Sequence, residues 1–251
     1  SSTSRGLGDV YKRQVMSNSK PKVAIVIPAY NEAEVISDVI GGIKSGMNKQ
    51  KLNYEVVVVD DGSSDNTAKL CRKEKVTVIS HILNSGSGSA TATGLSYAQQ
   101  KGFDIAVTMD ADGQHDPDDA IRGIKIMYES KADLLIGSRL INSQGMGKTK
   151  IIGNKGLSLF TFMIFGVKVT DSQSGLRIFS KKALGELRWK SSGYEFCSEM
   201  IWRAKQLKLG IDEYPITAIY TEYSKSRGQN NWNGVNIIKS LVKQRLMEFF
   251  E

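Results

Sequence analysis

Two aspartates separated by a single residue offer the clearest chemistry in this sequence. Asp110 and Asp112 end the apolar run at 103–110 and begin the segment after it, and Gln114 follows two residues later. Residues i and i+2 of an extended chain project to the same side, so the two carboxylates repel each other unless a cation lies between them. Mg²⁺ and Mn²⁺ favour such oxygen ligands, and Mg²⁺ commonly shares them with substrate phosphates. The spacing predicts a metal site, although solvated residues of a turn at Gly113 would give the same pattern.

Polar side chains follow three other apolar runs in the same way. They are Tyr30 and Glu32 after 23–28, Asp61 after 55–60, and Arg139 after 132–138. Ligands of an open parallel sheet bind beyond the carboxyl ends of its strands, so these groups are expected to meet at one edge. Asp61 keeps two interpretations, a contact to the base or ribose of a nucleotide and a place in the helix-capping loop that contains Asp65.

The elements that would position these groups alternate along the chain. Strands are expected at 23–28, 55–60, 76–82, 103–110 and 132–138, with helices at 33–45, from 66, at 88–101 and at 117–130. Continuous apolar strands separated by helices predict an α/β fold, with a mostly parallel central sheet and helices on both faces. Beyond residue 140 the expected elements are a strand at 176–179, a helix at 194–208, a strand near 214–221 and an amphipathic helix at 235–250.

The chain is expected to form one domain behind an unrelated leader. Its 251 residues, 40% of them hydrophobic, suit a single core. Residues 1–15 lack periodicity and are interpreted as a non-native or disordered leader, which leaves 16–251 as the domain. The apolar stretch 151–167 is too short to span a bilayer. It is either a buried core helix or a membrane-surface helix, and the basic loop before it favours the surface, which the helix at 235–251 could share.

Composition argues against several classes of function. The net charge of +8 is spread along the chain, without the basic and aromatic clusters of nucleic-acid-binding proteins. This charge fits solubility and attraction to phosphates or an anionic bilayer equally well. The chain has two histidines, and Cys71 and Cys197 lack metal-site spacing, so zinc is not expected. Two free thiols suit a reducing compartment and predict a cytoplasmic protein.

From about residue 22 to 240 the sequence resembles family 2 glycosyltransferases with the GT-A fold, in particular the dolichol-phosphate mannose synthase-like branch. The matching segments are VAIVIPAYNE (23–32), VVVDDGSSDNT (57–67), DADGQHDP (110–117), GSR (137–139), DSQSGLR (171–177) and YPITAIYTEYSKSRGQ (214–229). The resemblance implies that Mg²⁺ or Mn²⁺ assists transfer of a sugar from GDP or UDP to a polyprenyl phosphate, at the inner face of the cell membrane. Two alternatives remain, transfer to a glycan hydroxyl in cell-envelope polysaccharide synthesis and nucleotide-sugar binding without catalysis.

The resemblance also implies roles for individual residues. Those implied for the nucleotide are Pro28, Tyr30, Glu32, Val59, Asp61, Asp110 and Ala111. Those implied for the metal are Asp110, Asp112 and Gln114. Those implied for catalysis are Asp112, Arg139, Lys150, Lys225 and Arg227, where the four basic residues would face phosphates.

Two features depart from the pattern of this branch. The loop before Gly228 is longer than expected and is followed by Gln229, Asn230 and Asn231 instead of Ser-Lys, and Glu195 stands where a basic residue is common. The acceptor and the sugar are therefore less well defined than the metal and nucleotide sites. Transfer to a hydroxyl would in addition need a base, for which Glu199 and Asp171 are the candidates.

Overall fold

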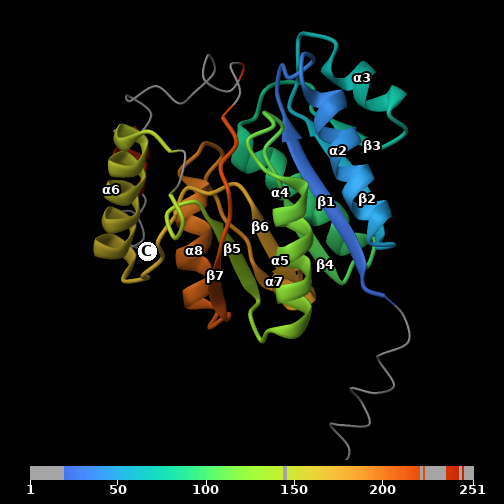
Figure 1. The fold of residues 1–251 in the computed structure, drawn as a ribbon. Coiled ribbons are helices and arrows are strands. Elements are labelled where there is room, and N and C mark those ends of the chain that lie inside the picture. Colours follow the sequence, from blue (N-terminus) through green and yellow to red (C-terminus); the bar gives the residue numbers. More distant parts are fainter. Residues whose placement is uncertain (1–19, 144–145, 221–222, 224–235, 243–244, 246–251) are drawn as a thin grey trace, which may run out of the picture.

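The computed structural model describes residues 20–143, 146–220, 223, 236–242 and 245 (Figure 1). The expected leader at 1–15 lies outside the described residues, as do Lys225 and Arg227.

A seven-stranded sheet forms the centre of the fold, in the order β3-β2-β1-β4-β6-β5-β7. Its strands are β1 (Lys22–Ala29), β2 (Asn53–Asp60), β3 (Thr77–Ser80), β4 (Ile105–Thr108), β5 (Leu134–Ser138), β6 (Arg177–Ser180) and β7 (Ile211–Pro215). All neighbours pair in parallel except that β6 is antiparallel to both β4 and β5. The expected mostly parallel α/β sheet is confirmed. Because β6 alone is reversed, its beginning lies at the edge where the other six strands end.

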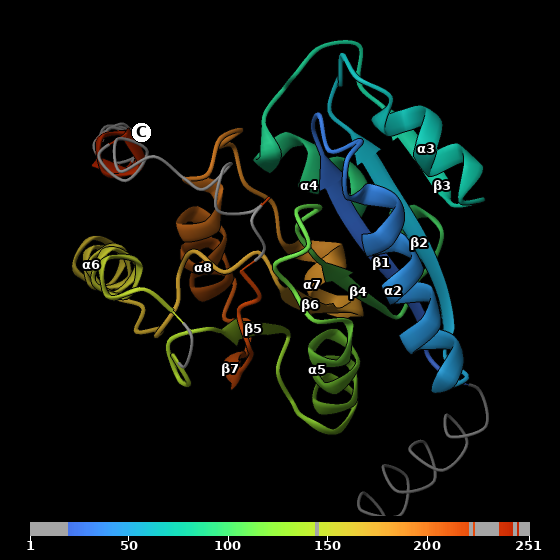
Figure 2. The same cartoon turned by 45° about the horizontal axis from the view of Figure 1, so that its top comes forward.

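Helices cover both faces of the sheet (Figures 1 and 2). On one face lie α2 (Ile36–Lys49), α3 (Thr67–Lys73) and α5 (Pro117–Glu129), and on the other lie α4 (Ser87–Gln100), α7 (Lys181–Glu186) and α8 (Phe196–Gln206). A hydrophobic core lies on each face of the sheet, and β1 contributes to both. Val23 and Ile25 point to the first group of helices, while Ala24 and Val26 point to the second. A strand buried on both faces must be apolar throughout, which explains its unbroken apolar run.

The strand expected near 214–221 instead occupies Ile211–Pro215. Beyond Pro215 the chain leaves the sheet, because the N–H of Thr217 donates to Asp119 (2.7 Å) and that of Ile219 to the carbonyl of Gln114 (3.0 Å). These bonds carry the segment toward the end of β4. They depend on tertiary partners, so the local sequence pattern did not indicate them.

A further helix, α6 (Lys148–Phe165), lies beside α8 and away from the sheet (Figure 2). Phe165 stacks on Trp202 of α8, with ring centroids 5.0 Å apart. The helical residues 236–242 turn Ile237 and Leu241 inward to the same core. Among the described helices, none combines the length and the apolar character needed to cross a bilayer.

Candidate functional site

The residues predicted to do chemistry meet at the edge where the parallel strands end. Pro28 of β1 lies opposite Val59 of β2, and β4 pairs with the other side of β1, so that Asp110 follows next in line. The reversed β6 brings the loop 171–176 to this edge from the opposite direction. The expected convergence of separate strand ends is therefore present, and the loop before β6 joins it.

Asp110 and Asp112 stand at the centre of this edge. The Asp110 side chain is 48% exposed. Gly113, with φ of 75°, turns the chain so that Gln114 faces Asp112. The backbone N–H and the side-chain amide of Gln114 donate to the Asp112 carboxylate at 3.0 and 2.7 Å. The three predicted ligands thus lie together in one short loop.

Two neighbours fix the position of the Asp110 carboxylate. His115 Nε2 donates to Asp110 Oδ2 at 3.0 Å, while the buried Nδ1 of this ring has no hydrogen-bond partner among the described residues. Gly175 lies directly behind the carboxylate, so that a methyl group at this position would overlap it. The Gly175 carbonyl in turn accepts a hydrogen bond from Thr108 of β4 at 2.8 Å. Only glycine permits this approach.

The two aspartates differ in electrostatic environment. Burial would raise the pKa of Asp110, but the hydrogen bond from His115 and the charges of His115, Arg139 and Arg177 outweigh it and lower this pKa. Burial, followed by the charge of Asp110, raises the pKa of Asp112. Two neighbouring carboxylates, of which Asp110 disfavours the ionisation of Asp112, lie beside an amide that could turn its oxygen toward them. This donor set fits a divalent cation.

Arg177 is a buried cation beneath this loop, with 1% of its surface exposed. Its guanidinium donates to the carbonyls of Ser172 (2.8 Å), Ser174 (2.9 Å) and Cys197 (2.9 Å). It forms no ion pair within the part of the chain that the structure describes. The side chain therefore ties the loop behind Asp110 to the first turn of α8.

Arg139 directly follows β5, as predicted, but its guanidinium is ion-paired with the carboxylate of Asp171. Its Nε and Nη2 donate to Asp171 at 2.7 and 2.9 Å. Although burial opposes the charge, Asp171 raises the pKa of Arg139. The candidate base Asp171 is thus fully buried in an ion pair. The other candidate, Glu199, is also buried and accepts from the N–H groups of Lys190 (3.0 Å) and Ser191 (2.8 Å).

Lys150 lies in the first turn of α6, exposed, with its ammonium 4.3 Å from the centroid of the Tyr220 ring. Tyr220 follows the segment that pairs with Gln114 and His115, and burial raises its pKa, on which the charges of Arg139 and Asp171 also act. Of the predicted basic residues, Lys150 therefore contacts Tyr220 directly, and Arg139 acts on it through its charge.

The residues predicted for the nucleotide fall into two groups. Tyr30 is 45% exposed and Glu32 is half-buried, where its carboxylate accepts from the hydroxyl of Tyr223 at 2.6 Å. Val59 and Ala111 are buried, so that mainly their backbone atoms could meet a ligand.

Asp61 belongs to neither group, because its carboxylate is filled by protein donors. Its Oδ1 accepts from His81 Nδ1 (2.7 Å) and the N–H of Ser85 (2.9 Å), and its Oδ2 accepts from the N–H of Gly86 (2.8 Å). The residue is 3% exposed. Asp61 therefore holds the loop before α4, and only a rearrangement of these donors would free it for a nucleotide.

Sequence reasoning missed several residues that complete the site. They are His115, Gly175, Arg177, Tyr194 and Tyr220. Tyr194 precedes α8, and burial, followed by the charges of Asp110 and Asp112, raises its pKa. His115 and Gly175 lie inside segments already recognised, DADGQHDP and DSQSGLR, so these motifs were the available signal.

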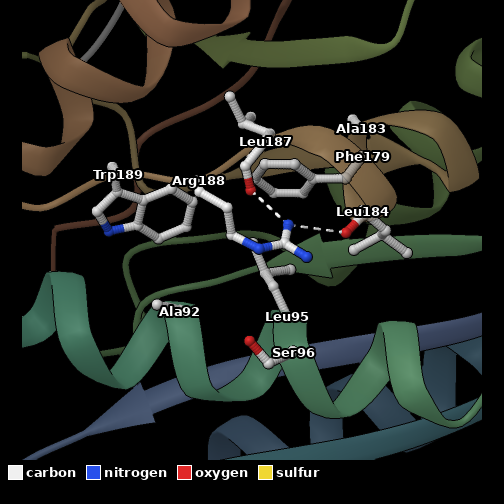
Figure 3. Close-up of a pocket in the computed structure, with 9 residues that line it drawn as sticks. All are labelled: Ala92, Leu95, Ser96, Phe179, Ala183, Leu184, Leu187, Arg188 and Trp189. Atoms are coloured by element: carbon white, nitrogen blue, oxygen red, sulfur yellow. Dashed lines mark hydrogen bonds between the residues drawn. The ribbon is translucent and has the colours of Figure 1, made fainter.

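A pocket elsewhere in the fold does not contribute to this edge. Figure 3 shows it between α4 and α7, lined by Leu95, Phe179 and Leu187, with the Arg188 guanidinium bonded to two backbone carbonyls at its side. Its volume is about 40 Å³. A space of this size is too small for a nucleotide sugar.

Comparisons with known proteins agree with this arrangement. The sequence profile of the family described as "Glycosyl transferase family 2" matches residues 24–188. A UDP-N-acetylglucosamine–dolichyl-phosphate N-acetylglucosaminyltransferase from Methanococcus voltae is 42% identical over 247 residues, covering 89% of this chain and 96% of the relative. An undecaprenyl-phosphate mannosyltransferase from Micrococcus luteus is 30% identical over 218 residues, covering 82% of this chain and 87% of the relative.

A solved structure shares the fold at low sequence identity. It is the glucosyl-3-phosphoglycerate synthase of Mycobacterium tuberculosis in complex with Mn²⁺, UDP-glucose and phosphoglyceric acid. The TM-score is 0.65 at 19% identity, over 88% of this chain and 79% of that chain.

Proposed function

Because this chain belongs to glycosyl transferase family 2 and has the GT-A fold, we propose that it transfers a sugar from a nucleoside diphosphate to the phosphate of a polyprenyl phosphate at a membrane surface. The observation that carries the proposal is the 42% identity to a dolichyl-phosphate N-acetylglucosaminyltransferase along nearly its whole length. That relative uses a UDP-linked sugar, which favours UDP over GDP as the donor nucleotide here.

The donor site comprises the ends of β1, β2 and β4. Asp110, Asp112 and Gln114 would hold Mg²⁺ or Mn²⁺ there, and the bound cation would neutralise the negative charge that develops on the departing diphosphate. Tyr30 and Glu32 would border the nucleotide through their side chains. Pro28, Val59 and Ala111 would contribute backbone atoms, and Asp61 would shape the nucleotide end through the loop that it holds.

The acceptor site comprises Arg139 and Lys150 on the far side of residues 110–115, which we call the metal loop. A phosphate oxygen is already anionic, so an acceptor of this kind needs no general base. Both carboxylates that could have served a hydroxyl acceptor, Asp171 and Glu199, are buried with hydrogen-bond donors of the protein. Because neither carboxylate is available to act as a base, this arrangement supports a phosphate over a glycan hydroxyl as the acceptor group. Lys225 and Arg227, outside the described residues, remain candidates for a third cation.

Helix α6 supports a membrane surface as the place of reaction, because large apolar side chains lie on its outer face while small polar ones face the protein. Its small polar residues Ser158 and Thr161 are buried against the protein, beside apolar residues such as Phe165. Three large apolar residues point outward, with Ile152 71%, Leu159 58% and Met163 64% exposed. A buried core helix, the alternative for this stretch, would have the reverse arrangement.

The charges of α6 suit an anionic bilayer. The helix contains Lys148, Lys150 and Lys155 and no acidic residue. Basic residues at one end and apolar residues beyond them are typical of helices that lie in the membrane interface. We infer that α6 rests on the cytoplasmic leaflet, where Lys150 would meet the lipid phosphate.

The catalytic proposal is tested by incubating the protein with Mn²⁺, a panel of UDP- and GDP-sugars, and undecaprenyl or dolichyl phosphate. Radiolabelled sugar should enter the lipid phase with at least one donor and should be absent with Asp112→Asn. Label that appears only on an added oligosaccharide would favour the glycan-hydroxyl alternative. Donor binding without transfer to any acceptor would leave a nucleotide-sugar-binding module.

The membrane proposal is tested by flotation with vesicles that contain anionic phospholipid. Leu159→Glu and Met163→Glu should weaken vesicle binding at least about tenfold, since each places a charge where an apolar side chain would enter the interface. Tyr128→Glu on α5, where the tyrosine is 60% exposed, is the matched control and should bind as the wild type does. Equal binding by all four proteins would contradict a role for α6.

A further inference from the structure

The segment after β7 is bonded first to the end of β5 and then to the metal loop. The N–H of Ile216 donates to the carbonyl of Ser138 (3.0 Å), and that of Ile219 donates to the carbonyl of Gln114 (3.0 Å). Ala218 pairs with His115 as an isolated antiparallel bridge. Tyr220 is the next residue after these bonds, so its backbone position is set directly by the loop that carries the metal ligands.

The ring of Tyr220 contacts one of the two cations of the proposed acceptor site. Lys150 Nζ lies 4.3 Å from its centroid, within the range of a cation–π interaction. Lys150 has no carboxylate partner among the residues that the structure describes, whereas Arg139 is neutralised by Asp171. The charges of Arg139 and Asp171 also act on the half-buried Tyr220 hydroxyl, whose pKa burial raises.

We propose that Tyr220 is a positioning residue for the transfer reaction, and that its ring holds the Lys150 ammonium at a fixed place beside Arg139 and the metal loop. The inference rests on the proposed function, because it assigns the two cations to the acceptor phosphate. Tyr220 itself touches no reacting atom in this scheme. It fixes the position of Lys150 on α6, in the acceptor site, relative to Asp110 and Asp112 after β4, in the donor site.

A lysine at the exposed beginning of a helix would otherwise sample many rotamers. Fixing such a side chain costs conformational entropy, and a cation–π contact offsets part of that cost before the substrate arrives. An aromatic ring suits the task better than a carboxylate would. The ring attracts the ammonium without neutralising it, so the full positive charge remains available to an incoming phosphate.

The test compares Tyr220→Phe with Tyr220→Leu under the transfer assay, with KM for the lipid phosphate and for the nucleotide sugar measured separately. Tyr220→Leu should raise KM for the lipid phosphate roughly 3- to 30-fold, the factor that a cation–π contact represents, with little change in KM for the donor. Tyr220→Phe keeps the ring and should recover most of that loss. Tyr128→Leu, a change of the same type on exposed α5, controls for the substitution itself.

Lys150→Met extends the test to the partner. If the ring acts through Lys150, adding Tyr220→Leu to Lys150→Met should have little further effect on KM for the lipid phosphate. Full additivity of the two changes would overturn the proposal, as would equal impairment by Tyr220→Phe and Tyr220→Leu. Absence of transfer by the wild-type protein is a different result, because it rejects the proposed function itself.

A second measurement does not depend on activity. With ¹³C-labelled lysine, the ε-methylene of Lys150, identified by its loss in Lys150→Arg, should show an upfield ring-current shift in the wild-type protein and in Tyr220→Phe. The shift should disappear in a folded Tyr220→Leu protein. A wild-type resonance at the ordinary lysine position would overturn the inference.

Discussion

Each of the two histidines in the chain bonds to an aspartate at a strand end, yet the two pairs are built for different purposes. His81 donates to Asp61 after β2 at 2.7 Å, and His115 donates to Asp110 after β4 at 3.0 Å. Asp61 has two further backbone donors and is 3% exposed. The Asp110 side chain is 48% exposed, and its neighbour Asp112 adds a second negative charge.

The difference in hydrogen bonding and exposure distinguishes a carboxylate that stabilises the fold from one that is accessible to a ligand. A buried carboxylate whose oxygens are filled by N–H groups stabilises the fold and has little capacity left for a cation. Two carboxylates that repel each other destabilise the fold until a cation binds. The same residue type after the same kind of strand thus serves stability at Asp61 and, under the proposed function, metal binding at Asp110 and Asp112.

Asp112→Asn is expected to have the largest effect and to separate stability from function. Sugar transfer should fall at least about 10²–10³-fold, because the diphosphate loses its metal-assisted stabilisation. The raised pKa of Asp112 means that its contribution to stability is present at low pH and is lost as the pH rises through the folded-state value. Removing the charge should therefore raise the Tm of the metal-free protein near pH 7 by about 2–4 °C, measured by calorimetry.

A lower Tm for metal-free Asp112→Asn would contradict the view that Asp110 and Asp112 oppose each other in the folded protein. Adding Mn²⁺ and UDP should raise the Tm of the wild type and have a much smaller effect on the variant, since only a bound ligand stabilises by mass action.

Gly175→Ala should have the next largest effect, and it should act on Asp110 and Asp112 without affecting Asp61. The added methyl group overlaps the Asp110 carboxylate and must displace it. Displacement of this kind costs about 1–3 kcal/mol, so the affinity for Mn²⁺ in the presence of UDP should fall roughly tenfold or more, measured by electron paramagnetic resonance. Gly41→Ala is the matched control, because the corresponding position on α2 is open and its methyl group meets no neighbour. Unchanged Mn²⁺ affinity in Gly175→Ala would show that Asp110 is not held by this contact.

Much of this comparison could be predicted from local sequence. Apolar runs gave the strands β1, β2, β4 and β5, and their alternation with helices predicted the parallel sheet whose ends gather the polar residues. The spacing of Asp110, Asp112 and Gln114 predicted a shared loop, and the structure confirms that these three lie together. Such features depend on neighbours within a few residues of each other, which is why periodicity and spacing reveal them.

The remainder depends on contacts between distant parts of the chain. The sequence surrounds Asp61 and Asp110 with similar motifs, and it does not indicate that Ser85 and Gly86 will satisfy one while Gly175 approaches the other. The reversed direction of β6 has no local signature either. It decides which loop reaches the site and therefore brings Gly175 and Arg177 there. Long-range pairing of this kind is what a single sequence leaves open.

Asp61→Asn should act in the opposite sense to Asp112→Asn. An amide can accept at only one of the two oxygen positions and carries no charge, so the hydrogen bonds from His81, Ser85 and Gly86 are weakened or lost. The free energy of unfolding should fall by about 2–3 kcal/mol, a Tm decrease of roughly 5–10 °C. The affinity for Mn²⁺ should change less than about threefold. A stable variant that has lost donor binding would instead assign Asp61 a direct contact with the nucleotide.

The smallest effect is expected for His81→Ala, and it probes whether Asp61 is held redundantly. The carboxylate keeps the N–H groups of Ser85 and Gly86, so the loss is close to that of one hydrogen bond, about 1 kcal/mol or 2–4 °C in Tm. The corresponding change His115→Ala removes the side-chain donor of Asp110 and should instead lower the affinity for Mn²⁺, because a ligand oxygen loses its orientation. Calorimetry and Mn²⁺ titration on both variants should thus give opposite patterns. If His81→Ala weakened Mn²⁺ binding as much as His115→Ala did, the two His–Asp pairs would have to be treated as one connected site.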